Sequence, residues 1–158
     1  MSPAVINPQV CLRWRKAHRM ALLAAFEDST TGTRVKEFCQ GLSRELGSEC
    51  RIIEHVWLFN TLRLRELQEI AAEEASSSDL VIISTHQDGS LPDEVKSWID
   101  LWLQQTARPP AILLALFDSD YSGGSSAVQA YLQKVARQGG MEFLIAAGEI
   151  TDVRYPSS

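Results

Sequence analysis

The chain alternates between short apolar runs and longer segments in which apolar residues recur every three or four positions. A continuous apolar run, without polar residues on alternate positions, is typical of a parallel β-strand that is covered on both faces. Five such runs predict five buried strands, at residues 20–26, 50–59, 80–85, 111–117 and 143–147.

The segments between these runs have the helical period. Apolar residues at spacings of three and four form one stripe along a helix, and that stripe packs against a sheet. Gly47 and the pair Gly139-Gly140 end two of the segments, and Pro92 begins a third. The stripes are Val35, Phe38, Cys39, Leu42 and Leu46; Val95, Trp98, Ile99 and Trp102; Val128, Tyr131, Leu132 and Val135; and a weaker one over 62–75.

Strands and helices therefore alternate, which predicts a doubly wound parallel α/β sheet with right-handed crossovers. We expect one domain over residues 20–150, an N-terminal extension over 1–19 and a C-terminal tail over 151–158. The tail is too short for the usual last helix. We therefore expect residues 10–18 to cover the face of the sheet that such a helix would cover.

Composition and charge exclude several classes of protein. A formal net charge of −5 argues against nucleic-acid binding, because phosphate contacts need clustered Lys and Arg. The basic segment before residue 20 resembles a signal peptide, but its apolar run is short and ends in Glu27-Asp28. No run reaches the roughly 20 apolar residues of a membrane helix. We expect a soluble, cytoplasmic protein without membrane contact.

The three cysteines show no pairing pattern and no metal-ligand spacing. They lie at positions 11, 39 and 50, without a CxxC pair and without a suitably spaced histidine. We expect them to be reduced thiols, with Cys39 buried on a helix face. The sequence contains no pattern that predicts a metal site.

In a doubly wound sheet the ligand lies beyond the carboxyl ends of the strands. Three loops are expected there, at residues 27–34, 86–91 and 118–126. The first contains Ser29, Thr30, Thr31, Gly32 and Thr33 and opens into a helix, whose free N–H groups favour an anion. The alternative is that these hydroxyls only cap the helix. The third loop offers glycines for close backbone approach and Tyr121 for stacking, or is a flexible connector.

Two stretches resemble the NADPH-dependent FMN reductases and their flavodoxin relatives. Residues 78–102 are similar to the third strand, loop and helix of that family, and residues 26–33 resemble the Ser-Thr-Thr-Gly-Asn-Thr phosphate loop of flavodoxins. The positions in register with the family over the first stretch are Gly89, Ser90, Pro92, Lys96, Ile99 and Asp100. The resemblance implies a flavodoxin-like three-layer sandwich with five parallel strands in the order 2-1-3-4-5.

The resemblance also implies a cofactor and a reaction. Ser29 to Thr33 would hold the phosphate of FMN, and the flavin would carry out hydride transfer from NAD(P)H without a catalytic side chain. It further implies a homodimer paired through the helix that follows Pro92. The isoalloxazine would lie between two sets of residues: His86, Gln87, Asp88, Gly89 and Ser90 on one side, and Asp118, Ser119, Tyr121 and Gly123 on the other.

Several residues depart from the family pattern. Glu27 and Asp28 place two carboxylates beside the expected phosphate, and like charges repel. His86 and Gln87 replace a Glu-Tyr pair, and Asp88 replaces an asparagine whose amide donates a hydrogen bond. A second interpretation is therefore a non-catalytic flavodoxin-like scaffold that has lost flavin binding and acts as an interaction module.

Two further classes fit less well. A phosphoacceptor receiver domain has an acidic pair after its first strand, as Glu27-Asp28 would be, but it also needs an aspartate after strand three and a lysine after strand five. Here the third strand ends in Ser84-Thr85-His86, and Gly148-Glu149 follow the fifth. A serine hydrolase is disfavoured because there is no GxSxG motif.

Overall fold

The computed structural model describes residues 14, 17–86, 89–105, 109–118, 126–147 and 153–154. The strands are β1 (Arg19–Phe26), β2 (Arg51–Leu58), β3 (Leu80–Ser84), β4 (Ile112–Phe117), β5 (Glu142–Ala147) and β6 (Val153–Arg154). The helices are α2 (Ser29–Leu46), α3 (Arg65–Ser76), α4 (Asp93–Gln105) and α5 (Ala127–Gly139), and a 3₁₀ turn, η1 (Phe59–Arg63), links β2 to α3.

The strands form one sheet in the order β2-β1-β3-β4-β5-β6. The first five run parallel, and β1 lies between β2 and β3: its Leu22 pairs with Glu54 of β2 and with Leu80 of β3. The α/β flavodoxin-like arrangement and the order 2-1-3-4-5 are confirmed. The two-residue strand β6 lies antiparallel to β5, within the segment that we expected to be a tail.

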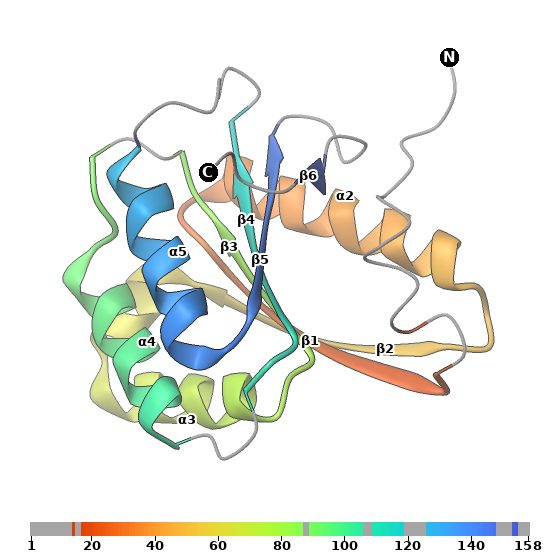
Figure 1. Cartoon of the computed structure of the whole chain (residues 1–158), viewed down its shortest axis with the longest axis horizontal. Coiled ribbons are helices and arrows are strands. Elements are labelled where there is room, and N and C mark those ends of the chain that lie inside the picture. The colour runs from red at the N-terminus through yellow and green to blue at the C-terminus, as the bar shows by residue number, and fades with distance from the viewer. Residues whose placement is uncertain are drawn as a thin grey trace.

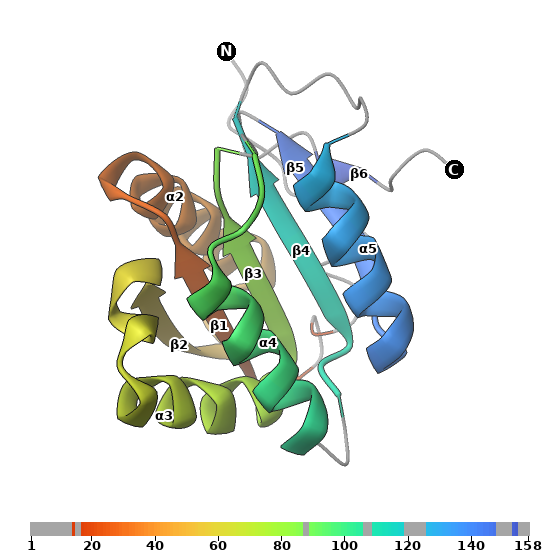
Figure 2. The same cartoon turned by 90° about the vertical axis from the view of Figure 1, so that its left-hand side faces the viewer.

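The helices form two layers, one on each face of the sheet. Helix α2 covers one face, and α3, α4 and α5 cover the other, as the two perpendicular views show (Figures 1 and 2). The apolar stripes predicted for α2, α4 and α5 face the sheet, with only Tyr131 of α5 partly buried. Cys39 is buried, as predicted. Among the described residues, no helix is long and apolar enough to cross a bilayer.

The face covered by α2 also contains a residue from the N-terminal segment. Trp14 is only 7% exposed and belongs to the same core cluster as Phe38 of α2 and Met20 of β1. Its carbonyl accepts a hydrogen bond from the N–H of Ala17 at 3.0 Å. Trp14 agrees with the prediction that residues 10–18 cover this face; residues 10–13, 15 and 16 lie outside the described part.

Strand β2 differs from the prediction of a strand buried on both faces. It lies at the edge of the sheet, and Arg51, Glu54 and Val56 are exposed, Val56 by 51%. The β2 run contains Arg51, Glu54 and His55, whereas the runs of β3 and β4 are apolar apart from Ser84. These polar positions suit an edge strand, and the order of the strands places β2 at the edge.

We predict that Trp14→Ala lowers the free energy of unfolding by about 3 kcal/mol or more, because truncating a buried aromatic side chain leaves a cavity in the core. Urea denaturation measures this change. Ile70→Ala is the control: Ile70 is 48% exposed, so its truncation is expected to change stability by about 0.5 kcal/mol or less. Equal effects of the two substitutions would show that Trp14 does not pack against the core.

Candidate functional site

The polar residues that follow β1, β3 and β4 meet at one edge of the sheet. Glu27 and Asp28 follow β1, Thr85 and His86 follow β3, and Asp118 follows β4. The chain goes from β1 to β2 on one side and returns to β3 on the other, so this edge contains the point where strand order reverses. Open α/β sheets bind their ligands at such a point.

Helix α2 begins earlier than predicted. Ser29 to Thr33 are its first residues and not a loop, because Asp28 caps the helix directly after β1. The Asp28 carboxylate accepts a hydrogen bond from the backbone N–H of Thr31 at 3.0 Å. The Thr31 hydroxyl oxygen accepts from the N–H groups of Glu27 at 2.9 Å and Asp28 at 2.8 Å. This reciprocal capping box gives the backbone N–H groups of Glu27, Asp28 and Thr31 partners from the protein's own side chains.

Several residues of the expected phosphate loop therefore have structural partners. Thr31 is fully buried in the capping box, and the Ser84 hydroxyl donates to its carbonyl at 2.9 Å. The Thr33 hydroxyl donates to the carbonyl of Ser29 at 2.9 Å. A Cβ atom on Gly32 would lie 3.0 Å from the Phe26 ring, so glycine allows α2 to approach the end of β1 closely. Thr31 therefore acts in the helix cap and Thr33 bonds within the helix, and the role of the segment in holding a phosphate stays a prediction.

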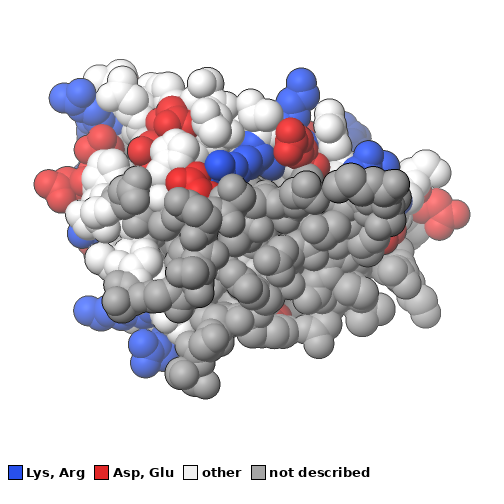
Figure 3. All heavy atoms as spheres, turned by 90° about the horizontal axis from the view of Figure 1, so that it is seen from above, with Lys and Arg blue, Asp and Glu red and all other residues white. Residues whose placement is uncertain are grey.

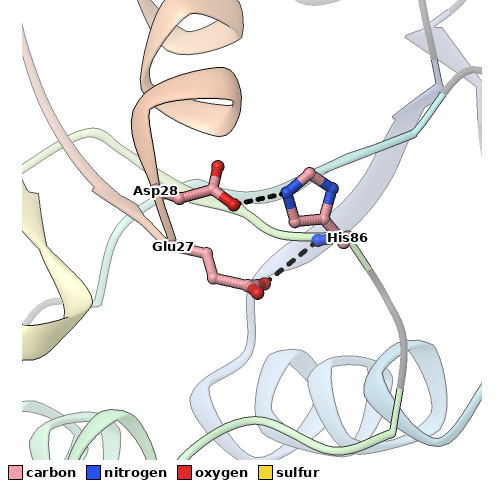
Figure 4. A group of neighbouring side chains, drawn as sticks. All are labelled: Glu27, Asp28 and His86. Atoms are coloured by element: carbon pink, nitrogen blue, oxygen red, sulfur yellow. Dashed lines mark hydrogen bonds and ion pairs between the residues drawn. The ribbon is translucent and has the colours of Figure 1, made fainter.

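His86 bridges two carboxylates from different elements. Its Nε2 lies 2.6 Å from Oδ2 of Asp28, and its Nδ1 lies 2.8 Å from Oδ1 of Asp118. Figure 4 shows the imidazole pointing toward the Asp28 carboxylate, with Glu27 beside them. One side chain thus links the segments that follow β1, β3 and β4.

The two outer acids of the cluster are also held in place. The Glu27 carboxylate accepts from the Thr85 hydroxyl at 2.6 Å and from the backbone N–H of His86 at 3.2 Å. Asp118 forms an ion pair with Arg34 of α2. Each carboxylate is therefore oriented by a group from a neighbouring element.

The cluster shifts the pKa values of its members in opposite directions. Hydrogen bonds to Asp28 and then to Asp118 raise the pKa of His86 above its usual value. The pKa of Asp28 is lowered, first by the backbone N–H of Thr31 and also by His86. With His86 protonated, the carboxylates of Glu27, Asp28 and Asp118 still outnumber the two cations, His86 and Arg34. The cluster remains net negative.

The structure brings together part of the predicted site. His86 and Asp118 meet beside Ser29–Thr33 at the start of α2. Gly89 has a φ of +66°, a conformation that favours glycine, and Ser90 is exposed. The other predicted site residues, Gln87, Asp88, Ser119, Tyr121 and Gly123, lie outside the described residues.

Sequence reasoning missed the role of Arg34 and Thr85 in this cluster. The sequence shows Glu27 and Asp28 as an acidic pair, which opposes a phosphate or resembles the acidic pair of a receiver domain, but it does not show their link to His86. Asp28 and His86 are 58 positions apart, and Arg34 and Asp118 are 84 apart. No local spacing rule connects residues at such separations.

Three side chains of the cluster could hold a metal ion. One ligand atom each from Glu27, Asp28 and His86 lie within 4.8 Å of one another.

Figure 3 shows the surface of the molecule from above relative to Figure 1. On the part that is coloured by residue type, acidic and basic side chains are interspersed.

Comparison with protein-family models, curated proteins and solved structures finds no match. The topology defines a flavodoxin-like α/β domain. The resemblance to FMN reductases stays a prediction.

We predict that His86→Gln destabilises the protein more at about pH 5.5 than at about pH 9, measured by urea denaturation in EDTA. The pKa of His86 is raised in the folded state, so its contribution is complete below the unfolded pKa of about 6.5 and is lost as the pH rises through the folded value. Asp28 has a lowered pKa, so its contribution is lost only in acid, below about pH 4. A pH-independent effect of His86→Gln would contradict the bridge.

We further predict that Asp28→Ala destabilises the protein by about 1 kcal/mol more than Asp28→Asn, because asparagine also caps helices well and alanine does not. Both substitutions remove the charge that faces His86, so their difference isolates the cap. Thermal unfolding of the two variants at one pH measures this difference. Equal stability would show that the cap does not hold the start of α2.

Proposed function

We propose that this flavodoxin-like domain binds a divalent metal ion through Glu27, Asp28 and His86. The proposal rests on one observation. One imidazole nitrogen and one oxygen from each of two carboxylates lie within 4.8 Å of one another, at the carboxyl ends of the strands. The residues come from the ends of β1 and β3, two adjacent and fully paired strands. A rigid sheet therefore sets the spacing of the ligands.

The orientation of His86 supports this proposal. Histidines that bind metals usually donate the N–H of the other ring nitrogen to a carboxylate, which fixes the tautomer and aims the free nitrogen. Asp118 lies at hydrogen-bond distance from Nδ1 of His86, and Arg34 holds Asp118 in turn. Nε2 is thereby aimed at Asp28. A metal ion bound at Nε2 would take the place of the proton between His86 and Asp28, and that proton would pass to the solvent.

The donor set indicates the class of metal. Two carboxylates with one imidazole suit ions that accept both oxygen and nitrogen, such as Mn²⁺, Fe²⁺ or Zn²⁺. The Asp28 side chain is 45% exposed, so one side of such an ion would be accessible to water or a substrate. A metal with an open position activates water or polarises a carbonyl or phosphoryl oxygen.

FMN binding with NAD(P)H-dependent reduction is the second candidate function. The position of the edge at the strand-order reversal favours it, because nucleotide cofactors bind there in related topologies. Charge favours the metal over FMN. The start of α2 already has the Asp28 carboxylate as its anion, and Glu27 and Asp118 would repel a phosphate. A third outcome, a scaffold that binds neither ligand, corresponds to the interaction module.

Titration with Mn²⁺, followed by electron paramagnetic resonance, and with Zn²⁺, followed by calorimetry, tests the proposal. We expect binding by the wild type and at least about 10-fold weaker binding by Asp28→Asn and by Asp118→Asn, since loss of a ligand or of its orienting partner typically costs 10- to 100-fold. Asp28→Asn removes a charge and keeps a capping side chain. Glu73→Gln, in the exposed face of α3, is the matched control and should bind as the wild type does.

A parallel FMN titration by fluorescence quenching separates the candidates. Metal binding that is indifferent to Asp28→Asn would place the ion elsewhere and end the proposal. Quenching of FMN at micromolar concentrations without metal binding would favour the reductase. A protein that binds none of Mn²⁺, Zn²⁺ and FMN would favour the scaffold that acts as an interaction module.

A further inference from the structure

The two outermost strands of the sheet, β2 and β6, form its lateral edges, and these two edges are built differently. Strand β6 pairs with β5 at one edge through two residues in antiparallel orientation. At the other edge β2 runs for eight residues, and within the described part of the chain its outer side pairs with no strand. Proteins usually protect such an edge with proline, charged side chains, lysine above all, a bulge or a short strand. The β2 sequence, Arg-Ile-Ile-Glu-His-Val-Trp-Leu, contains neither proline nor lysine, and its charged residues are Arg51 at the first position and Glu54.

The hydrogen-bonding groups at this edge can be assigned. The N–H of Arg51 donates to the carbonyl of His18 at 2.8 Å, on the side of β1. Backbone N–H and C=O groups point to alternate sides along a strand. The backbone groups of odd-numbered residues of β2 therefore point toward β1, and those of even-numbered residues point outward. The outward set is Ile52, Glu54, Val56 and Leu58.

The side chains beside this edge are partly apolar. Val56 is 51% exposed, although it is a large aliphatic residue in a strand. It lies on the wall of a groove of about 310 Å³ between β2 and α2, together with Val35, Lys36, Cys39 and Glu54. The groove therefore contains one cation and one carboxylate on a mainly aliphatic surface.

We propose that β2 pairs with β2 of a second copy of this chain, antiparallel, about a two-fold axis at His55. A two-fold axis perpendicular to the sheet places the α2 faces of both copies on the same side. Residues that lie opposite each other must then have side chains on the same face, so even-numbered residues of one β2 pair only with even-numbered residues of the other. Of these, the register centred on His55 pairs the outward set completely with itself. Ile52 then faces Leu58 of the partner, and Glu54 faces Val56 of the partner.

The side chains agree with this register. Apolar Ile53 lies opposite Trp57 of the partner, and the two Glu54 carboxylates do not face each other directly. Glu54 of the partner lies across from Val56, on the wall of the groove that also contains Lys36. The cation of one copy is thereby brought toward the carboxylate of the other. Charge and backbone pairing both favour a copy of the same strand as the occupant.

This interface differs from the pairing through the helix after Pro92 that the family resemblance implies. It lies outside the metal site, since none of its residues belongs to the cluster around His86. The two proposals can therefore fail independently.

Sedimentation of the wild type and of Val56→Lys tests the interface. We expect a wild-type dimer and at least about a 10-fold weaker association for Val56→Lys, because a lysine in the centre of an edge strand opposes pairing. Val56 is half exposed, so the variant should fold. Ile70→Lys, at an exposed apolar position on α3 outside the edge, should dimerise as the wild type does. A wild type that sediments as a monomer at roughly 100 µM, or a Val56→Lys dimer of unchanged affinity, would overturn the proposal.

Cross-linking tests the register. In the proposed pairing the two His55 residues are a non-hydrogen-bonded pair with Cα atoms about 4.5 Å apart, which is within the range that a disulfide spans. In a Cys11→Ser background, His55→Cys should form a disulfide-linked dimer on oxidation with diamide. Glu73→Cys, exposed on α3, should not. Equal cross-linking of both variants would reject the His55 axis.

Discussion

The burial of β1, β3 and β4 on both faces is the constraint on which the rest of the structure depends. Apart from Ser84 at the end of β3, these strands carry apolar side chains along their buried lengths, so charged groups can lie only where the strands end. Parallel direction places those ends at one edge. Glu27, His86 and Asp118 are neighbours for this reason, although they are far apart in the chain.

The start of α2 determines which charge the edge can accept. A helix N-terminus has free N–H groups and a positive dipole end, which a bound phosphate can satisfy. Here the Asp28 carboxylate, which accepts from the N–H of Thr31, already places a negative charge at that end. The same Asp28 carboxylate is then shared with His86. A segment that resembles a phosphate loop in composition therefore acts as a capped helix beside an acidic cluster.

The edge at β2 and the cluster at the strand ends are consequences of the same topology. Strand β1 lies between β2 and β3, and β2 is the outermost strand on its side of the sheet. The outer position of β2 leaves its backbone groups pointing outward without a neighbouring strand among the described residues. The position of β3 on the other side of β1 creates the reversal in strand order. The cluster of Glu27, Asp28 and His86 shares no residue with β2, through which two copies would associate.

The sequence by itself determined the five parallel strands, the helices between them and the edge at which polar residues gather. Continuous apolar runs and stripes of period 3.6 report burial directly, because they depend only on neighbouring positions. Resemblance to a family with known strand order supplied the order 2-1-3-4-5, and the position of His86 after the third apolar run pointed to the site. The stripe of Val35 and Phe38 predicted the face that α2 buries.

Only the tertiary structure decided which strand lies exposed and which charges meet. The exposure of Val56 depends on strand order, and the link between Arg34 and Asp118 depends on the placement of α2 above the end of β4. Interactions between distant positions follow from how whole elements pack, and local sequence patterns do not contain that information.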